Sequence, residues 1–382
     1  MVIGFLAHVI PYRARRGIGN FSYNLLKALL DTDRGNAYRC LYTIFGSAKR
    51  NLVLRSDHPH HVNLVWPLPL PVLKLLCDRW RILVVEDLFG GVDVFHAPAG
   101  PHAFLPTARR ARTVITVHDV KRLRHPEFFR RKAVRLFADR IKRAADAADR
   151  ILVVSANTKE ELIAFTGIPK DKVVVTSEGI GAHFKPIKDH SAINATTRRY
   201  GVNGPYILYV GAAKENKNLK RLVTAFTLVK KETDIDHHLV LAGSPEWGYR
   251  SFQREIRSVV GLREDIVFPG YVTDTDLPHF YAGADVLAMP SIHEGFGLPA
   301  AEAMACGTPV LVSNRASFPE VVGDAGLQVD PYKADEIAAG LLRLIGDEEL
   351  RRTCIQKGLA RAKDMTWDVV ARRVLSVYKE VA

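Results

Sequence analysis

The chain has 382 residues, 47% of them hydrophobic and 25% charged, which is typical of a globular protein with two domains or three small ones. Four scattered cysteines without a C-x-x-C pair argue against a disulfide framework or zinc site and indicate a reducing, cytoplasmic compartment, and neither a signal peptide nor a run of about twenty apolar residues is found. The net charge of +13 falls entirely in residues 1–180, with 29 Lys and Arg against 16 Asp and Glu, so this half suits an anionic membrane or an acidic substrate unless it only aids solubility.

The first half alternates buried strands with amphipathic helices. A glycine-rich loop with Gly17 and Gly19 separates the first strand from a helix at 21–30, which Asn20 is predicted to cap. Strand, loop and helix in this order form the first unit of a doubly wound parallel sheet, whose ligands bind at the carboxyl ends of the strands. The predicted strands are 2–7, 38–45, 61–65, 92–96, 113–117, 151–155 and 173–176.

His118 directly follows one of these strands and is therefore predicted to lie in the ligand crevice. Its position fits a hydrogen-bonded structural histidine equally well. Further along, the helix predicted at 127–149 places seven Arg and Lys residues opposite a modest apolar face that includes Phe137 and Ile141. We expect this helix to pack on the core, with weak attraction to anionic lipid as a secondary role.

Residues 181–204 lose periodicity and are predicted to link a domain at 1–180 to a domain at 205–365. The second domain repeats the alternation of strands and helices, which implies another parallel sheet covered on both faces. Its predicted strands are 207–211, 239–242, 266–268, 285–289 and 310–313, and its predicted helices are 219–231, 249–260, 277–281, 335–345 and 348–363. A final helix within 366–382 could pack back on the first domain.

The strongest functional pattern is S-I-H-E-G-F-G-L-P-A-A-E-A-M-A-C-G-T-P-V-L-V-S-N, at residues 291–314. Pro299 suits the first turn of a helix, and Gly307 is typical of its end. The positive helix start would turn backbone N–H groups towards a phosphate. Glu294 and Glu302 flank this turn, and carboxylates there suit hydroxyl groups. A ligand with both phosphates and many hydroxyls is a nucleotide sugar.

With these two domains and this stretch, the sequence resembles the retaining glycosyltransferases of family 4. That family has the GT-B fold, in which two Rossmann-like domains face each other across a cleft. Its E-x7-E pattern is matched by Glu294 and Glu302, and the surrounding string, with P-E-V-V-G-D-A-G from Pro319, is similar to bacterial mannosyltransferases of polysaccharide and O-antigen assembly. R-G-I-G-N-F-S-Y-N-L-L near the start, T-V-H-D at 116–119 and Y-V-G-A-A-K-E-N-K-N-L from Tyr209 also match.

The resemblance implies a role for each candidate residue. Glu302 would bind the ribose of the nucleotide, and Glu294 would bind hydroxyls of the transferred sugar near C3 and C4. Lys217 would neutralise the leaving diphosphate, and His118 would touch the sugar near its reacting carbon. Further contacts to the phosphates, the sugar and the base would come from Gly17, Gly19, Gly211, Gly295, Phe296, Gly297, Leu298, Tyr271 and Val272.

The sequence departs from the family at Ala212, where many members carry an arginine that helps bind the diphosphate. Lys214, or one of Arg13, Arg15 and Arg16, could supply the missing charge. No side chain is a convincing nucleophile, so we expect a front-side mechanism without a covalent intermediate. We expect no metal cofactor, because the D-x-D strings at Asp31 and Asp274 are better explained by a helix end and by capping.

The resemblance favours GDP-mannose as the donor, with a UDP-sugar of glucose, GlcNAc or galactose as the alternative. The acceptor is expected to be a glycan or a polyprenyl-diphosphate-linked glycan, bound by the basic first domain and the proline-rich loop 66–71 at the inner membrane face. A soluble oligosaccharide acceptor and a non-catalytic nucleotide-sugar-binding protein stay open. A nicotinamide oxidoreductase is disfavoured because no complete G-x-G-x-x-G is present, and nucleic acid is not expected because no binding module is recognisable.

Overall fold

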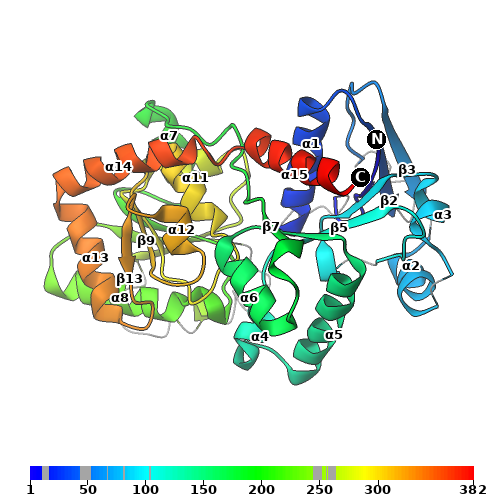
Figure 1. Ribbon diagram of the computed structural model, residues 1–382. Helices are drawn as coiled ribbons and strands as arrows, with labels where there is room; N and C mark the ends of the chain where they lie inside the picture. Colours follow the sequence, from blue (N-terminus) through cyan, green and yellow to red (C-terminus); the bar gives the residue numbers. More distant parts are fainter. Residues whose placement is uncertain are drawn as a thin grey trace. The chain divides into compact units, whose positions relative to one another are not determined.

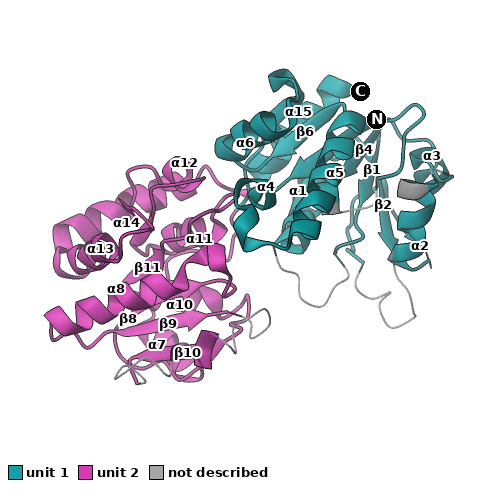
Figure 2. Ribbon diagram, turned by 90° about the horizontal axis from the view of Figure 1, so that it is seen from below, with its two compact units in different colours: residues 1–179, 367–382 teal, residues 180–366 magenta. Residues whose placement is uncertain are grey.

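The computed structural model describes residues 1–10, 17–43, 53–66, 68–80, 82–102, 105–243, 252–254, 256 and 264–382. The chain forms two compact units, which Figure 2 shows in different colours: unit 1 is residues 1–179 with 367–382, and unit 2 is residues 180–366. Each unit is a parallel β-sheet with helices packed on it (Figure 1). The loop with Arg13, Arg15 and Arg16 and most of the helix expected at 249–260 lie outside the described residues.

The sheet of unit 1 has the order β3-β2-β1-β4-β5-β6-β7, and all of its neighbouring strands are parallel. The interior strand β1 pairs with β2 and β4, so that Ile3 lies opposite both Tyr38 and Val94. The strands are β1 Val2–Leu6, β2 Ala37–Thr43, β3 His61–Trp66, β4 Val94–Ala97, β5 Arg112–Val117, β6 Arg150–Val153 and β7 Val173–Val175. This is the doubly wound arrangement predicted from the sequence.

Two helix starts in unit 1 differ from the prediction. The first helix begins at Ile18 behind Gly17, so Asn20 lies inside its first turn and does not cap it. The basic helix begins at Arg131, because Pro126–Phe128 form a separate 3₁₀ turn and Arg130 is extended. The helices are α1 Ile18–Thr32, α2 Leu70–Lys74, α3 Val85–Phe89, α4 Lys121–Arg124, α5 Arg131–Ala147, α6 Ala156–Thr166 and α15 Trp367–Val381, with a π-helix at Leu75–Arg79.

The last helix of the chain, α15, belongs to unit 1 and packs along α1 (Figure 1). Its Tyr378 is fully buried, and the hydroxyl lies 2.5 Å from Nδ1 of His96 in β4. Nε2 of the same ring lies 2.9 Å from the hydroxyl oxygen of Thr116 in β5. Burial lowers the pKa of His96 to about 3, so the ring is neutral at ordinary pH. A buried polar chain therefore ties α15 to the centre of the sheet.

The sheet of unit 2 has the order β10-β9-β8-β11-β12-β13 and is also parallel. Its strands are β8 Tyr206–Val210, β9 His238–Ala242, β10 Ile266–Gly270, β11 Val286–Met289, β12 Val310–Ser313 and β13 Leu327–Val329. The edge strand β13 was not expected, because its three residues, with Gln328 in the middle, do not form an apolar run. Its position is set by pairing with β12, where Leu327 lies opposite Leu311.

The predicted linker 181–204 is part of unit 2 and contains a helix, so the expectation of an irregular segment there was wrong. Asp189 caps this helix by accepting a hydrogen bond of 3.0 Å from the N–H of Ala192, and Ile193 is buried. The helices of unit 2 are α7 His190–Arg198, α8 Leu219–Glu232, α10 Leu277–Gly283, α11 Leu298–Cys306, α12 Phe318–Val322, α13 Ala334–Gly346 and α14 Glu348–Ala362, with a 3₁₀ turn at Glu215–Lys217.

Candidate functional site

Two loops meet at the carboxyl edge of the sheet in unit 2. One loop, 211–218, follows β8, and the other, 290–297, follows the neighbouring strand β11. The side-chain amide of Asn216 donates to the carbonyl of His293 at 3.0 Å, and the amide of Asn218 donates to the carbonyl of Pro290 at 2.9 Å. Asn218 precedes α8 as predicted, but its side chain does not cap that helix. Instead, the two asparagines join the loops, and this fixes where Lys217, which lies between them, is placed.

Lys217 and Glu294 form an ion pair through Nζ and Oε1. The hydroxyl of Ser291 donates to the same carboxylate oxygen at 2.9 Å. The side chains of Lys217 and Glu294 are only 20% and 11% exposed, so water screens their attraction weakly. Two residues predicted for one ligand therefore touch each other, and Ser291, which the sequence pattern did not single out, orients the carboxylate.

The glycine turn and the helix after it have the predicted form. Gly297 has a φ of 91°, and a Cβ there would lie 2.6 Å from a ring carbon of Phe318, so this position requires glycine. The hydroxyl of Ser317 lies 2.8 Å from the carbonyl oxygen of Phe296 and holds the turn against α12. Helix α11 begins at Leu298, with Pro299 in its first turn. The start of an α-helix therefore directly follows the turn that carries Glu294, as expected for an anion-binding site.

Glu302 lies in the second turn of α11 and is held differently from Glu294. Its Oε2 accepts a hydrogen bond of 2.8 Å from the hydroxyl of Tyr281 in α10. Tyr281 is fully buried, and burial together with the charge of Glu302 raises its pKa well above the ordinary value. The phenol therefore stays protonated and donates to the carboxylate. Tyr281 was also missed in the sequence, where nothing distinguishes it from a core residue.

The remaining candidates of unit 2 follow β8 and β10 of the same sheet. A Cβ on Gly211 would lie 2.6 Å from the hydroxyl oxygen of Tyr209, and that hydroxyl donates to the carbonyl of Ala212 at 3.1 Å. Tyr271 and Val272 follow β10, which is two positions from β8 in the strand order. The ring of Tyr271 is 51% exposed, whereas Val272 is buried.

Asp31 and Asp276 of the two D-x-D strings contact side chains of their own units. Asp31 pairs with Lys27 one turn earlier in α1, at 2.5 Å. Asp276 precedes α10 but makes no capping bond, contrary to the prediction. Its carboxylate pairs instead with Arg199 at 2.9 Å and accepts a hydrogen bond of 2.7 Å from Tyr200.

In unit 1, His118 lies at the carboxyl end of β5, as predicted. Its Nε2 donates to the carbonyl of Pro98 at 2.8 Å, and its Nδ1 lies 3.6 Å from Oε1 of Glu178. The ring of Phe21 in α1 packs against it with the centroids 4.6 Å apart. Gly17 and Gly19 form the start of α1, so α1 brings its amino-terminal turn to the same edge of the sheet as His118.

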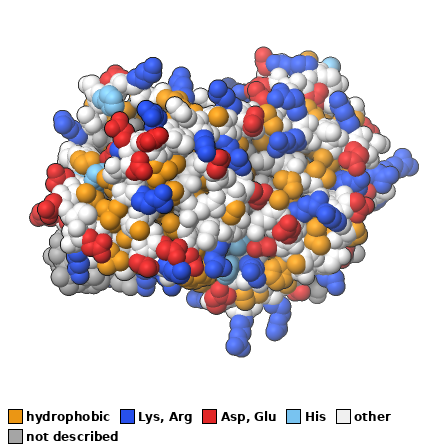
Figure 3. All heavy atoms as spheres, turned by 60° about the vertical axis from the view of Figure 1, so that its left-hand side comes forward, with side chains coloured by type: hydrophobic (Ala, Val, Ile, Leu, Met, Phe, Trp, Pro, Cys, Tyr) orange, Lys and Arg blue, Asp and Glu red, His pale blue; other side chains and the backbone are white. Residues whose placement is uncertain are grey.

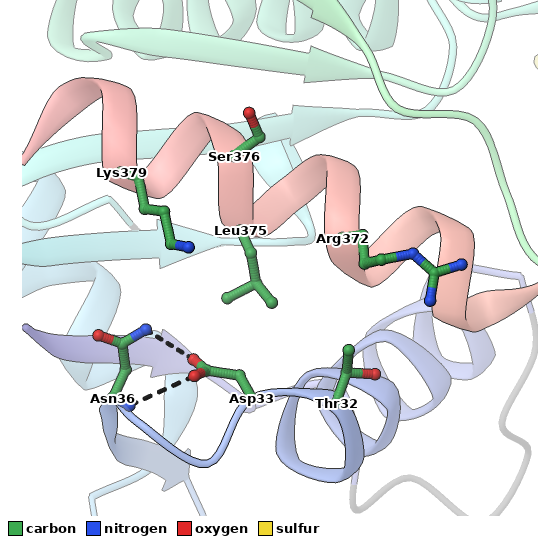
Figure 4. A pocket seen from close by; sticks show the side chains of 7 residues that line it. All are labelled: Thr32, Asp33, Asn36, Arg372, Leu375, Ser376 and Lys379. Carbon is green, nitrogen blue, oxygen red and sulfur yellow. Dashed lines mark hydrogen bonds between the residues drawn. The ribbon is translucent and has the colours of Figure 1, made fainter.

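A cavity of about 410 Å³ lies elsewhere on unit 1, between the end of α1 and α15 (Figure 4). Figure 4 shows Asp33 turned towards Asn36, and the Asp33 carboxylate accepts two bonds from Asn36, at 2.7 and 3.3 Å, and one of 2.7 Å from Tyr38. Ser376 points away from the cavity, and Leu375 points into it. Asp33 and Asn36 of its wall are thus bonded to each other, and the cavity lies beside the beginning of β2, at the opposite edge of the sheet from His118.

The sequence matches two family models, one in each half of the chain. Residues 15–183 match the family described as Glycosyltransferase Family 4, and residues 198–361 match the one described as Glycosyl transferases group 1. A curated relative, O-antigen chain mannosyltransferase B of Escherichia coli, is 34% identical over 320 residues, which cover 82% of this chain and 80% of the relative. The serotype-specific mannosyltransferase WbdA of Escherichia coli is 30% identical over 231 residues, covering 58% of this chain but 28% of WbdA.

Solved structures share the fold at low sequence identity. Sucrose-phosphate synthase of Thermosynechococcus elongatus aligns with a TM-score of 0.76 and 21% identity, covering 100% of this chain and 99% of that structure. HepE of Anabaena, solved in complex with UDP-glucose, aligns with a TM-score of 0.75 and 20% identity over 100% of both chains. These alignments support two Rossmann-like parallel-sheet units of the GT-B type.

Proposed function

The chain belongs to the family 4 glycosyltransferases, and from this premise we propose that it transfers mannose from GDP-mannose to a hydroxyl of a glycan or lipid-linked glycan acceptor, with retention of the anomeric configuration and without a metal ion. The observation that carries the proposal is the Lys217–Glu294 ion pair beside the start of α11. It places a cation, a carboxylate and a helix amino terminus together, as a diphosphate joined to a sugar requires.

The ion pair suggests how the site changes when the donor binds. In the free protein Lys217 and Glu294 neutralise each other. The diphosphate would pair with Lys217, and the sugar hydroxyls would donate hydrogen bonds to Glu294, so that neither charge is left without a partner. Glu302, held by Tyr281, would accept hydrogen bonds from the ribose. His118 in unit 1 is proposed to contact the sugar near C1.

In the proposed front-side step, the bond between C1 and the diphosphate oxygen breaks, and its electron pair goes to the diphosphate. The acceptor hydroxyl oxygen forms the new bond to C1 from the same face, and its proton passes to the departing phosphate oxygen. Lys217 lowers the barrier by stabilising the negative charge that grows on the diphosphate. A covalent glycosyl-enzyme trapped by rapid quenching and found by mass spectrometry would contradict this step.

The donor assignment rests on the mannosyltransferase relatives. A UDP-sugar is the second candidate, because HepE was solved with UDP-glucose. The purified protein should be given GDP-mannose, UDP-glucose, UDP-GlcNAc, UDP-galactose and ADP-glucose in turn with a polyprenyl-diphosphate-linked glycan, and the released nucleotide and the product should be measured. We expect turnover with GDP-mannose and an α-linked product. Turnover with a UDP-sugar alone would overturn the donor assignment.

Two further experiments test whether a metal takes part and whether the protein is a catalyst. Transfer measured after treatment with EDTA should equal the untreated rate if no metal takes part. Glu294→Ala and Lys217→Ala should both abolish transfer if the protein is a catalyst, whereas a nucleotide-sugar-binding protein would bind the donor but turn over none even as wild type.

We also propose that unit 1 contacts an anionic membrane surface, where a lipid-linked acceptor would be presented. Within the described part of the chain, no helix is both long and apolar enough to cross a bilayer. Helix α5 exposes Arg131, Lys132, Arg135 and Lys142, together with Leu136, which is 46% exposed. Phe137 and Ile141 on its other face are buried in the core of unit 1. The face of the molecule in Figure 3 carries basic and acidic side chains interspersed.

Sedimentation with vesicles tests this membrane contact. We expect binding to vesicles that contain phosphatidylglycerol, weak binding to pure phosphatidylcholine, and release as salt is raised. The double variant Arg131→Gln, Arg135→Gln should bind less, whereas Arg351→Gln, Arg352→Gln on α14 of unit 2 is a control of equal charge. Equal binding by the two double variants would contradict the proposal.

A further inference from the structure

A closed circuit of contacts surrounds His118 in unit 1. Phe21 packs on His118, and Trp367 at the start of α15 packs on Phe21 with the ring centroids 5.5 Å apart. Gly179 lies directly against Trp367, since a Cβ on Gly179 would be 2.5 Å from the indole ring. Glu178, next in the chain, returns to His118 through its carboxylate. The circuit thus joins the His118 segment to α1, to α15 and to the turn that follows β7.

The turn that carries Glu178 is constrained on both sides. Ser177 has a φ of 72°, in the left-handed region that side-chain-bearing residues rarely adopt. Gly179 has no room for a side chain, because a Cβ would also lie 2.8 Å from the Cα of Trp367. Strain of this kind persists only where the surroundings over-determine it. Its effect is to direct the Glu178 side chain towards His118 after β7 has ended.

The two ring nitrogens of His118 both face acceptors. A carbonyl oxygen can only accept, so the 2.8 Å contact with Pro98 places a proton on Nε2. Nδ1 faces the carboxylate of Glu178 at 3.6 Å, and both side chains are shielded, with 12% and 16% of their surface exposed. A flipped ring would turn a carbon towards both acceptors. The hydrogen bond to Pro98 therefore sets the orientation of the imidazole, and Phe21 limits its tilt. The Nδ1–Glu178 distance is too long for a hydrogen bond, so Glu178 attracts this side of the ring by charge when Nδ1 also carries a proton.

We propose that Glu178 is a positioning residue of the transfer reaction, which holds the His118 ring at the angle needed to contact the sugar of the donor. This inference rests on the proposed function of His118. Glu178 is not assigned any contact with donor or acceptor, so its effect passes through the ring. Misplacement of a catalytic group by about 1 Å can cost about 100-fold in rate, whereas binding of the nucleotide by unit 2 should hardly change.

The test compares Glu178→Gln, Glu178→Asp and Glu178→Ala with wild type in two measurements. The first is kcat and KM for GDP-mannose. The second is the ¹⁵N spectrum of the histidine rings without substrate, in which His118 is assigned by its absence from His118→Ala. We expect Glu178→Gln and Glu178→Ala to lower kcat about 100-fold, with KM within about threefold of wild type. Both variants should also shift the signals of the two His118 ring nitrogens. Glu178→Asp should recover part of the kcat and part of the signal positions.

The matched control is Glu127→Gln, because Oε1 of Glu127 lies 3.0 Å from Nδ1 of His125 in another His–Glu pair of the same unit. It should leave kcat and the His118 signals unchanged. The proposal is overturned if the His118 signals do not move in Glu178→Gln, or if kcat stays within about threefold of wild type while His118→Ala is inactive. Should wild type transfer no sugar at all, the proposed function fails, and the spectrum alone still decides whether Glu178 positions the ring.

Discussion

The carboxyl edges of the two sheets hold their candidate residues by different means. In unit 2, Glu294 is held by the charge of Lys217 and the hydroxyl of Ser291, and Glu302 by the phenol of Tyr281. In unit 1, the His118 ring contacts the carbonyl of Pro98 and the carboxylate of Glu178, but it is also held by packing against Phe21, with the Trp367–Gly179 contact behind it. Groups held by charge can exchange partners when a ligand arrives, whereas a ring held by packing keeps its geometry.

The largest effect is expected from removing the carboxylate of unit 2. Glu294→Ala takes away the proposed sugar contact and leaves Lys217 without its partner, so kcat should fall about 1000-fold. Steady-state transfer assays measure this loss, and Glu215→Ala, an exposed residue on the same 3₁₀ turn as Lys217, is the control. A Glu294→Ala enzyme with a near-normal kcat would mean that the charged cluster does not serve catalysis.

Lowering the pH should destabilise unit 1 more than unit 2. Burial lowers the pKa of both His8 and His96 in unit 1 to about 3. In the unfolded chain these rings take up protons near pH 6.5, so the free energy of unfolding falls as pH drops below that value, by about 2 kcal/mol per ring between pH 7 and pH 5. Hydrogen exchange at both pH values, corrected for its intrinsic pH dependence, should show unit 1 losing more protection than unit 2. Equal losses in the two units would be inconsistent with this assignment.

Adding a single methyl group at Gly179 tests the packing around His118. Gly179→Ala would place a Cβ 2.5 Å from the Trp367 ring, so we expect a loss of about 1–3 kcal/mol in the free energy of unfolding. Urea titration followed by circular dichroism measures it. Gly91→Ala is the control, because nothing lies within 4 Å of a Cβ there. If both variants were equally stable, the Trp367 contact would not constrain the turn.

The smallest effect is expected from removing the Tyr281 hydroxyl, the uncharged partner of Glu302 in unit 2. Tyr281→Phe removes the phenol hydroxyl that donates to Glu302 and leaves the buried ring in place. Losing this hydrogen bond should weaken GDP binding about fivefold, or about 1 kcal/mol, in isothermal titration calorimetry. Tyr332→Phe, which alters an exposed phenol of unit 2 that is assigned no contact with the donor, is the control. An unchanged affinity for GDP in Tyr281→Phe would remove Tyr281 from the binding site.

The parts predicted well are those in which local pattern decides structure. The strands other than β13, the turn at Gly297 and the helix from Leu298 to Cys306 follow from hydrophobic runs and from the backbone preferences of glycine and proline. Short elements such as β13, and α7 within the expected linker, carry too few periodic residues to be recognised. They are set by the neighbours they pack on.

The partners of the candidate residues could not be predicted, because they come from distant segments. Lys217 and Glu294 are 77 positions apart, and Tyr281 precedes Glu302 by 21. Sequence analysis assigned roles to Lys217, Glu294 and Glu302, but only the packing of neighbouring loops and helices shows what each touches in the free protein. Glu178 was assigned no role for the same reason, since its contact with His118 joins the ends of two different strands.

The attachment of α15 to unit 1 has a consequence for biosynthesis. Residues 1–179 are made first, but Tyr378, which reaches His96 at the centre of their sheet, leaves the ribosome only after all of unit 2. Until then the newly made first unit has an uncovered apolar surface, where Val374 and Tyr378 will later be buried. Unit 2 is continuous in sequence and can complete its fold earlier. Unit 1 is therefore the first to be synthesised but the last to be completed.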